Sequence, residues 1–216
     1  MRFFALLSIA AIITSCTPST DDKIKNFWTW FVNNKESFEH LNESSRDEKL
    51  DLIIEHLQPI TDGLAVEVSS EIKKTRALVI SPEGDKTKFS VVRRIVDAAP
   101  LMQGWKVTAF RQRDTSDFIL EYRSLKFTPS EMYFHPLVEG DSLDLIIYSK
   151  GIKNHNPDTV ALYGLITLDN VLGEYDCVME VRDYDFQDLD DEKDKSDLRP
   201  LKELPRFVDN FHRTNK

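Results

Sequence analysis

The sequence lacks the motifs of the common catalytic chemistries. Its five histidines are scattered and form neither a metal-spaced pair nor an HExxH motif, so we expect no metal site. No GxSxG elbow, Walker loop or dinucleotide fingerprint occurs, and we expect no cofactor. Ser70-Glu-Ile-Lys73 matches an SxxK pattern, but it lies in a predicted turn without an SDN or KTG partner.

A hydrophobic run long enough to cross a bilayer is also lacking. The apolar segment Phe3–Ile13 is shorter than the about 20 residues that a spanning helix needs. Met1-Arg2 precedes it, and Ile13-Thr-Ser-Cys16 follows, which resembles the lipobox of bacterial lipoproteins. We predict a signal peptide at 1–15 and an acylated Cys16 that opens a polar tether at 16–22. An ordinary secretory signal and a buried N-terminal helix are the alternatives.

The tether bears on the location of the lipoprotein. Its acidic pair, Asp21-Asp22, resembles the export signals of Bacteroides-type surface lipoproteins. Thr17 is not the aspartate that is associated with inner-membrane retention, so the resemblance implies the outer membrane, on either face. Acyl chains such as palmitate would hold an otherwise soluble domain on the membrane.

Cysteine is scarce, with only two in the chain. If Cys16 is acylated, Cys177 remains alone and no internal disulfide forms, so stability must come from a hydrophobic core. A mature chain of roughly 200 residues can bury about 70% of its unfolded surface, which is sufficient. For Cys177, a small buried apolar side chain is favoured over a catalytic thiol.

An excess of positive charge is lacking too. The formal net charge is -9, and -10 once Arg2 is removed with the signal, which argues against nucleic acid as a partner. Eight acidic residues against two lysines lie between Asp183 and Asp197. We expect a solvated loop there; the alternative is a weak cation site, although the glycine and terminal glutamate of an EF-hand are missing.

The central stretch from Ala77 to Arg113 reads as strand, turn, helix, turn and strand. Ala77–Ile80 is a short apolar run, and the turn Pro82–Asp85 follows it. Apolar residues then recur with helical spacing from Phe89 to Ala99, and Pro100 ends that helix. Trp105–Ala109 alternates as a strand, so the stretch has the size of a βαβ unit.

The flanks predict further elements. An aromatic helix is expected from Lys23 to Leu41, and a second helix starts at a capping box formed by Ser45 and Glu48. After the central unit, a second strand-helix-strand unit is indicated, with Asn156 as the helix cap. This unit consists of a strand at Leu143–Tyr148, a helix ended by Gly173, and a strand begun by Cys177, Met179 and Val181. A C-terminal helix is expected after it, from Leu201 to Phe211.

Together these elements predict an α+β fold. We expect one mostly antiparallel sheet with two strand-helix-strand units, an elaborated ferredoxin-like arrangement, and an N-terminal helical hairpin. No linker divides the chain, so a single domain is predicted for 23–216.

Polar residues embedded in apolar elements give the candidate sites. Asp169 interrupts an apolar helix, Glu174 follows its end, and Arg111 ends the strand that begins at Trp105. If the two units share a sheet, these residues meet at one edge of it and form either an internal salt bridge or a ligand cleft. Trp30 lies off the apolar stripe of its helix, and a helix buried on two sides is the favoured explanation. The alternative is that Trp30, with Phe110, forms a contact surface.

Three sequence blocks carry a resemblance to a family. They are FWTWFVNN at 27–34, APLMQGW at 99–105 with AFRQ at 109–112, and LDNVLGEYD at 168–176. These blocks resemble an uncharacterised bacterial lipoprotein family of unknown function. The resemblance implies a recurring globular module and no catalytic residues.

We therefore predict a lipid-anchored envelope protein that acts as a non-enzymatic binding or accessory module. Its partners are the membrane, through the N-terminal lipid, and a protein or small polar ligand. The alternative is an envelope hydrolase that uses Asp169, Glu174 or their neighbours with an arginine.

Overall fold

The computed structural model describes residues 17–42, 44–69, 71–114 and 116–214. The predicted signal peptide at 1–15 and the lipidation site Cys16 lie outside these ranges, so both stay predictions. Within the described ranges, no helix is both long and apolar enough to span a membrane.

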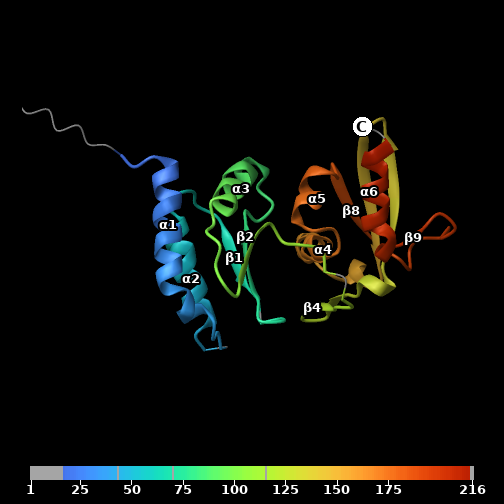
Figure 1. The fold of residues 1–216 in the computed structure, drawn as a ribbon. Coiled ribbons are helices and arrows are strands. Elements are labelled where there is room, and N and C mark those ends of the chain that lie inside the picture. Colours follow the sequence, from blue (N-terminus) through green and yellow to red (C-terminus); the bar gives the residue numbers. More distant parts are fainter. Residues whose placement is uncertain (1–16, 43, 70, 115, 215–216) are drawn as a thin grey trace, which may run out of the picture.

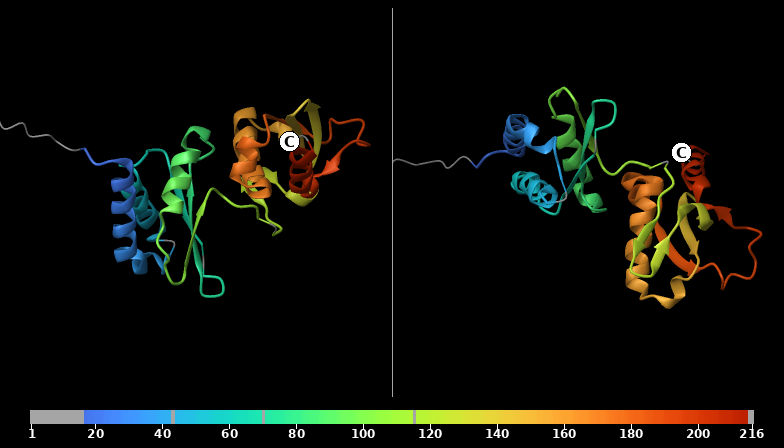
Figure 2. Two further views of the ribbon diagram at one scale, coloured as in Figure 1. Left: turned by 45° about the horizontal axis from the view of Figure 1, so that its top comes forward. Right: turned by 90° about the horizontal axis from the view of Figure 1, so that it is seen from below.

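The fold is α+β, as predicted, and its buried hydrophobic side chains form two separate clusters. Figures 1 and 2 show the two lobes that surround these clusters. The N-terminal lobe (20–109) contains α1 (Thr20–Asn34), α2 (Arg46–Leu57), β1 (Ala65–Val68), β2 (Arg76–Ser81), α3 (Phe89–Asp97) and β3 (Trp105–Ala109). The C-terminal lobe (120–214) contains β4 (Leu120–Tyr122), β5 (Leu125–Phe127), β6 (Tyr133–Glu139), β7 (Ser142–Ser149), α4 (Pro157–Leu172), α5 (Glu174–Met179), β8 (Asp183–Asp188), β9 (Arg199–Pro200) and α6 (Leu204–Thr214).

The N-terminal lobe is built on the central unit. β1 pairs antiparallel with β2, and β3 pairs parallel with β2 after the crossover through α3. α3 buries Phe89, Val92 and Ile95, the residues of its helical stripe. Trp28 of α1 donates its indole N–H to the Ile95 carbonyl at 2.7 Å, so the predicted helix pair packs against this unit.

The C-terminal lobe repeats the same plan in a four-stranded sheet of order β8-β7-β6-β9. β6 and β7 form an antiparallel hairpin, and β8 pairs parallel with β7 after the crossover through α4 and α5. α4 begins as predicted: the Asn156 side chain accepts hydrogen bonds from the backbone N–H groups of Asp158 and Thr159, and Pro157 occupies the first turn.

The prediction of one sheet is wrong, because the described strands form three sheets of three, two and four strands. Each strand-helix-strand unit extends its own hairpin. The chain leaves the first sheet at Phe110, whose left-handed backbone (φ 67°) turns it away from β3 before the second sheet begins. The range 23–216, predicted as a single domain, therefore encloses two hydrophobic cores.

The ends of the first helix also differ from the prediction. α1 starts at Thr20 rather than Lys23, because Ser19 and Asp22 form a capping box. It ends at Asn34 and a short 3-10 turn follows. The capping box predicted at Ser45 does not form; the Ser45 hydroxyl donates to the Asn42 side chain instead.

The strand predicted at 177–181 is wrong as well. Glu174–Met179 is a short helix, α5, and the strand of this unit is Asp183–Asp188. The acidic segment predicted as a loop thus begins with β8. Burial alternates along this acidic strand, because Tyr184 and Phe186 are more buried than Asp183 and Asp185.

Candidate functional site

The two lobes meet where the chain after β3 runs along the C-terminal end of α4. Phe110 is 5% exposed here and packs against both Phe89 and Tyr175, with the Arg93 guanidinium over the rings of Phe110 and Tyr175. The expectation that Phe110 belongs to an exposed contact surface is therefore wrong. Its left-handed turn buries the ring and directs the next residues toward α4.

This segment satisfies carbonyls that the end of α4 leaves open. Arg113 Nε donates to the Leu172 carbonyl at 2.8 Å, and the Asp114 N–H donates to the Asn170 carbonyl at 2.7 Å. Gly173 (φ 80°) allows the approach, since a Cβ there would lie 3.3 Å from the Arg111 oxygen and from the Arg113 nitrogen. A cation at this helix end also suits the helix dipole.

Glu174 joins the lobes through a fully buried carboxylate. Oε1 accepts hydrogen bonds from the Ser81 hydroxyl at 2.9 Å and from the Gly84 N–H at 2.8 Å. Oε2 accepts from the Arg111 N–H at 3.1 Å, and the Glu174 N–H donates to the Arg111 carbonyl at 3.0 Å. Three donors from the N-terminal lobe and its exit segment are thus held by one side chain of α5.

Arg113 adds charge pairs to the same seam. Its Nη2 lies 2.5 Å from an Asp176 oxygen and 2.7 Å from an Asp209 oxygen. These contacts link the exit segment to α5 and α6. The hydrogen bond to Asp209, together with that to Asp176, raises the pKa of the Arg113 guanidinium above its ordinary value.

A cavity of about 580 Å³ opens between the lobes beside this seam. Sites of this kind, at interfaces between compact units, are common places for small ligands. Its polar lining includes Glu67, Glu83, Arg111 and Asp169, and its apolar lining includes Leu162, Leu165, Ile166 and Val178.

Arg111 stands among three carboxylates in this interlobe cavity. Nε donates to Glu67 at 2.6 Å, Nη2 donates to Glu83, and Nη1 lies 4.0 Å from Asp169. Burial lowers the pKa of the Arg111 guanidinium, but the bonds to Glu67 and Glu83 outweigh it and raise the pKa overall. Three acids against one arginine leave the cavity with excess negative charge.

Asp169 is the carboxyl with the most perturbed protonation in this cavity. Burial raises its pKa to about 6, and the neighbouring charge of Glu174 acts in the same direction. Its side chain is 20% exposed, so the group stays accessible to a ligand. A cation placed beside Asp169 would relieve both effects.

An apolar strip of α4 continues the cavity toward the surface. Leu162 is 56% exposed, Leu165 is 42% exposed and Ile166 is 38% exposed. These residues lie one helical turn or less apart, so they form a continuous strip next to Asp169. A ligand in this cavity therefore meets both carboxylates and aliphatic surface.

Cys177 is among the residues that line the interlobe cavity, and it is buried, as expected. Burial, and then the charge of Asp169, raises the pKa of Cys177 above its ordinary value. The neighbouring Tyr184 hydroxyl donates to the Cys177 carbonyl at 2.9 Å. A thiol kept protonated in this way is a poor nucleophile.

Sequence reasoning found part of this arrangement. Arg111 and Asp169 line the interlobe cavity, whereas Glu174 is buried behind it as a structural link. Trp30 is half-buried and stacks on His56 with ring centroids 3.6 Å apart. The acids Glu67 and Glu83 were missed, because nothing local in the sequence marks exposed glutamates that later face an arginine.

Among the residues that the structure describes, no group of three or more His, Cys, Asp or Glu side chains is placed to hold a metal ion. No protein-family model matches the chain, and no curated protein or solved structure matches it significantly.

Proposed function

We propose that this chain is a lipid-anchored cell-envelope protein that binds a small amphipathic cation in the interlobe cavity without transforming it. The observation that carries the proposal is the composition of the cavity wall. Glu67, Glu83 and Asp169 exceed the single positive charge of Arg111, and the aliphatic strip of α4 lies beside them.

The charge balance decides the ligand class. Arg111 is already engaged by Glu67 and Glu83, so an anionic ligand would have to displace them. An ammonium or guanidinium group instead adds a charge-assisted bond to Asp169 and leaves the existing pairs intact. An alkyl group of the same ligand would cover Leu165 and Ile166, which are partly exposed.

Isothermal titration calorimetry with three probes of equal chain length tests this selectivity. We expect n-hexylammonium to bind more tightly than 1-hexanol, and hexanoate to bind least, because only the first pairs with Asp169. Asp169→Asn should weaken hexylammonium binding about tenfold, the scale of one charge-assisted bond.

Asp51→Asn is the matched control, since Asp51 is an exposed aspartate on α2 in the other lobe. Its affinity for hexylammonium should equal that of the unchanged protein. Equal binding of hexanoate and hexylammonium would contradict the proposed ligand class.

Hydrolysis is the competing function, and Asp169 is the feature that favours it. A carboxyl with a pKa raised to about 6 suits general acid-base catalysis near neutral pH. Glu174, the second acid of that hypothesis, is fully buried and accepts hydrogen bonds from three donors. A hydrolase built on this pair would lack an accessible second carboxylate, which is why binding is the better-supported proposal.

The lipid anchor has a test of its own. Metabolic labelling with a clickable fatty acid should mark the unchanged protein and leave Cys16→Ala unmarked. Equal labelling of both would remove the anchor from the proposal and leave the ligand untouched, whereas the calorimetric result bears only on the ligand.

A further inference from the structure

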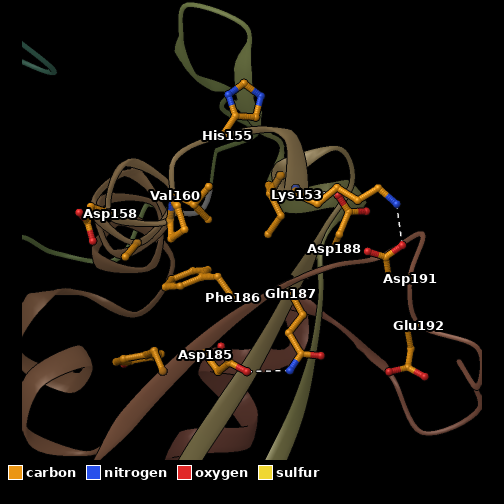
Figure 3. A pocket seen from close by; sticks show the side chains of 14 residues that line it. Lys153, His155, Asp158, Val160, Asp185, Phe186, Gln187, Asp188, Asp191 and Glu192 are labelled. Atoms are coloured by element: carbon orange, nitrogen blue, oxygen red, sulfur yellow. Dashed lines mark hydrogen bonds and ion pairs between the residues drawn. The ribbon is translucent and has the colours of Figure 1, made fainter.

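A second cavity, of about 600 Å³, lies at the outer edge of the four-stranded sheet, and Tyr184 lines both this cavity and the interlobe cavity. It opens between β8, the first turn of α4 and the short helical turn after β7 (Figure 3). Figure 3 shows Phe186 on its floor, with Val160 and Asp158 on one side and Lys153 on the other.

β8 itself has one open side. It is the last strand of the sheet order β8-β7-β6-β9, and within the described ranges it pairs only with β7. An unpaired strand edge presents backbone N–H and C=O groups that another extended chain can pair with.

The side chains of β8 alternate along this edge. Asp183, Asp185 and Gln187 are exposed, while Tyr184 and Phe186 are partly buried toward α4. The Phe186 ring fits against Gly164, where a Cβ would lie 2.3 Å from it. The ring is thus held at the cavity floor by a close approach that only glycine allows, and it stays partly exposed.

The second cavity carries a strong charge imbalance. Five acidic side chains line it against one lysine, and Lys153 is already bonded to Asp191 at 2.6 Å. Asp188 is buried and accepts backbone N–H groups from Lys153 and Asp190. The remaining acids, Asp158, Asp185 and Glu192, form no ion pair with this lysine, which is the one cationic lysine or arginine among the residues that line the cavity.

Acidic side chains on an edge strand also protect against unwanted sheet pairing. Protection explains Asp183 and Asp185. It does not explain a cavity with an aromatic floor next to the strand, where alternate side chains of an added strand would insert.

We propose that the open edge of β8 binds an extended, basic segment of a protein partner by strand addition. The partner's backbone would pair with the edge of β8. Its apolar side chains would enter the second cavity over Phe186, and its lysine or arginine side chains would meet Asp158, Asp185 and Glu192. This inference does not depend on the interlobe ligand.

The test uses the full chain in detergent and a fluorescent seven-residue peptide of alternating lysine and valine. Fluorescence anisotropy should show saturable binding, and hydrogen exchange of 183–188 should slow when the peptide is added. The same peptide with glutamate for lysine should not bind. A version N-methylated at alternate residues keeps its charge but cannot pair as a strand, and it should bind at least about tenfold more weakly.

Asp185→Lys should weaken the peptide about tenfold or more through like-charge repulsion. Gln187→Lys is a second variant at an exposed position of the same strand, and Asp51→Lys gives the control charge change in the other lobe. The proposal is overturned if the lysine-valine peptide does not bind. It is also overturned if the N-methylated peptide binds equally well, or if Asp51→Lys weakens binding as much as Asp185→Lys.

Discussion

At the scale of single residues, two carboxyl groups that are close in sequence have opposite roles. Glu174 is fully buried and surrounded by donors, so its charge is compensated by hydrogen bonds. Asp169 is partly exposed and has its closest cation, Arg111, 4.0 Å away. Glu174 therefore links the two lobes, whereas the charged form of Asp169 costs free energy that a bound cation or a proton can relieve.

That cost predicts a pH dependence of stability. The pKa of Asp169 is raised from 3.8 to about 6 in the folded protein, so the folded state binds this proton more tightly than the unfolded state. Its stabilising contribution is complete below about pH 4 and is lost as the pH rises through about 6. As the pH rises from 4 to 7, this ionisation should lower the unfolding free energy of the unchanged protein. We expect the decrease to be smaller in Asp169→Asn, by roughly 2 kcal/mol.

Urea unfolding at several pH values measures this difference. Asp51→Asn should reproduce the profile of the unchanged protein, because Asp51 is an exposed aspartate. If the unfolding free energies of Asp169→Asn and the unchanged protein change with pH in parallel, ionisation of Asp169 does not destabilise the folded state.

For Glu174, in contrast to Asp169, we expect removal of the carboxylate to destabilise the fold. Glu174→Ala leaves the Ser81 hydroxyl and the Gly84 and Arg111 N–H groups without their acceptor, so we expect a loss of about 3 to 5 kcal/mol in urea unfolding. Glu174→Gln keeps one acceptor but places an amide donor near donors, and its loss should be smaller. Glu121→Ala, an exposed glutamate on β4, is the control. A loss below about 1 kcal/mol for Glu174→Ala would contradict the assigned role.

At the scale of elements, the end of α4 depends on one backbone conformation. Gly173→Ala introduces both a left-handed alanine and a Cβ that lies 3.3 Å from two backbone atoms of the exit segment. Gly151→Ala is the control for a positive φ without crowding: Gly151 has φ 76° and ψ 7°, against φ 80° and ψ 143° at Gly173, and no atom lies within 4 Å of its Cβ. We expect thermal or urea unfolding to show a loss of about 1 kcal/mol for Gly151→Ala and roughly 2 to 3 kcal/mol for Gly173→Ala. Equal losses would mean that the close approach is not important.

Helix starts show what local sequence can and cannot establish. The cap at Asn156 was predictable because Pro157 and the following apolar spacing agree with it. The Ser45 pattern matched a capping box equally well, but its hydroxyl is taken by Asn42. Ser19 and Asp22 were assigned to a tether, although they fit the same rule. Short capping motifs have several local competitors, and only the folded chain selects one.

These starts can be ranked by experiment. Asn156→Ala and Ser19→Ala should each lower the unfolding free energy by about 1 kcal/mol, since each removes a side-chain acceptor of backbone N–H groups. Ser45→Ala should cost less, because its side chain makes no such bond. Equal losses for Ser45 and Ser19 would contradict the observed caps.

At the scale of the whole molecule, the periodic elements were largely predictable and their assembly was not. The first strand-helix-strand unit and the helix pair before it were anticipated from apolar spacing. The strand and helix that open the second unit were anticipated too, but its last strand was placed at 177–181 instead of Asp183–Asp188. Arg111 and Asp169 were identified because charged residues stand out in apolar elements. Glu67 and Glu83 lie 44 and 28 positions before Arg111, and the fold rather than the local sequence places them beside it.

The seam between the lobes should control access to Cys177. Arg113→Met removes the bonds to Leu172, Asp176 and Asp209, so the lobes should separate more often. We expect thiol labelling of the peptide that contains Cys177, followed by mass spectrometry under native conditions, to become roughly tenfold faster.

Arg182→Met is the matched control for this seam. Arg182 also pairs with two acids, Glu139 and Asp144, but it does so within the C-terminal lobe. Its labelling rate should stay near that of the unchanged protein. An equal acceleration in both variants would point to general loosening instead of lobe separation.

Because α1 starts at Thr20, the tether between Cys16 and the first helix is short. Only Thr17–Ser19 stand between Cys16 and the helix, and four Cα steps reach at most roughly 14 Å, less than the about 22 Å length of a 15-residue helix. A lipid on Cys16 would therefore keep the N-terminal lobe close to the bilayer surface. Any partner would have to come to the membrane to meet it.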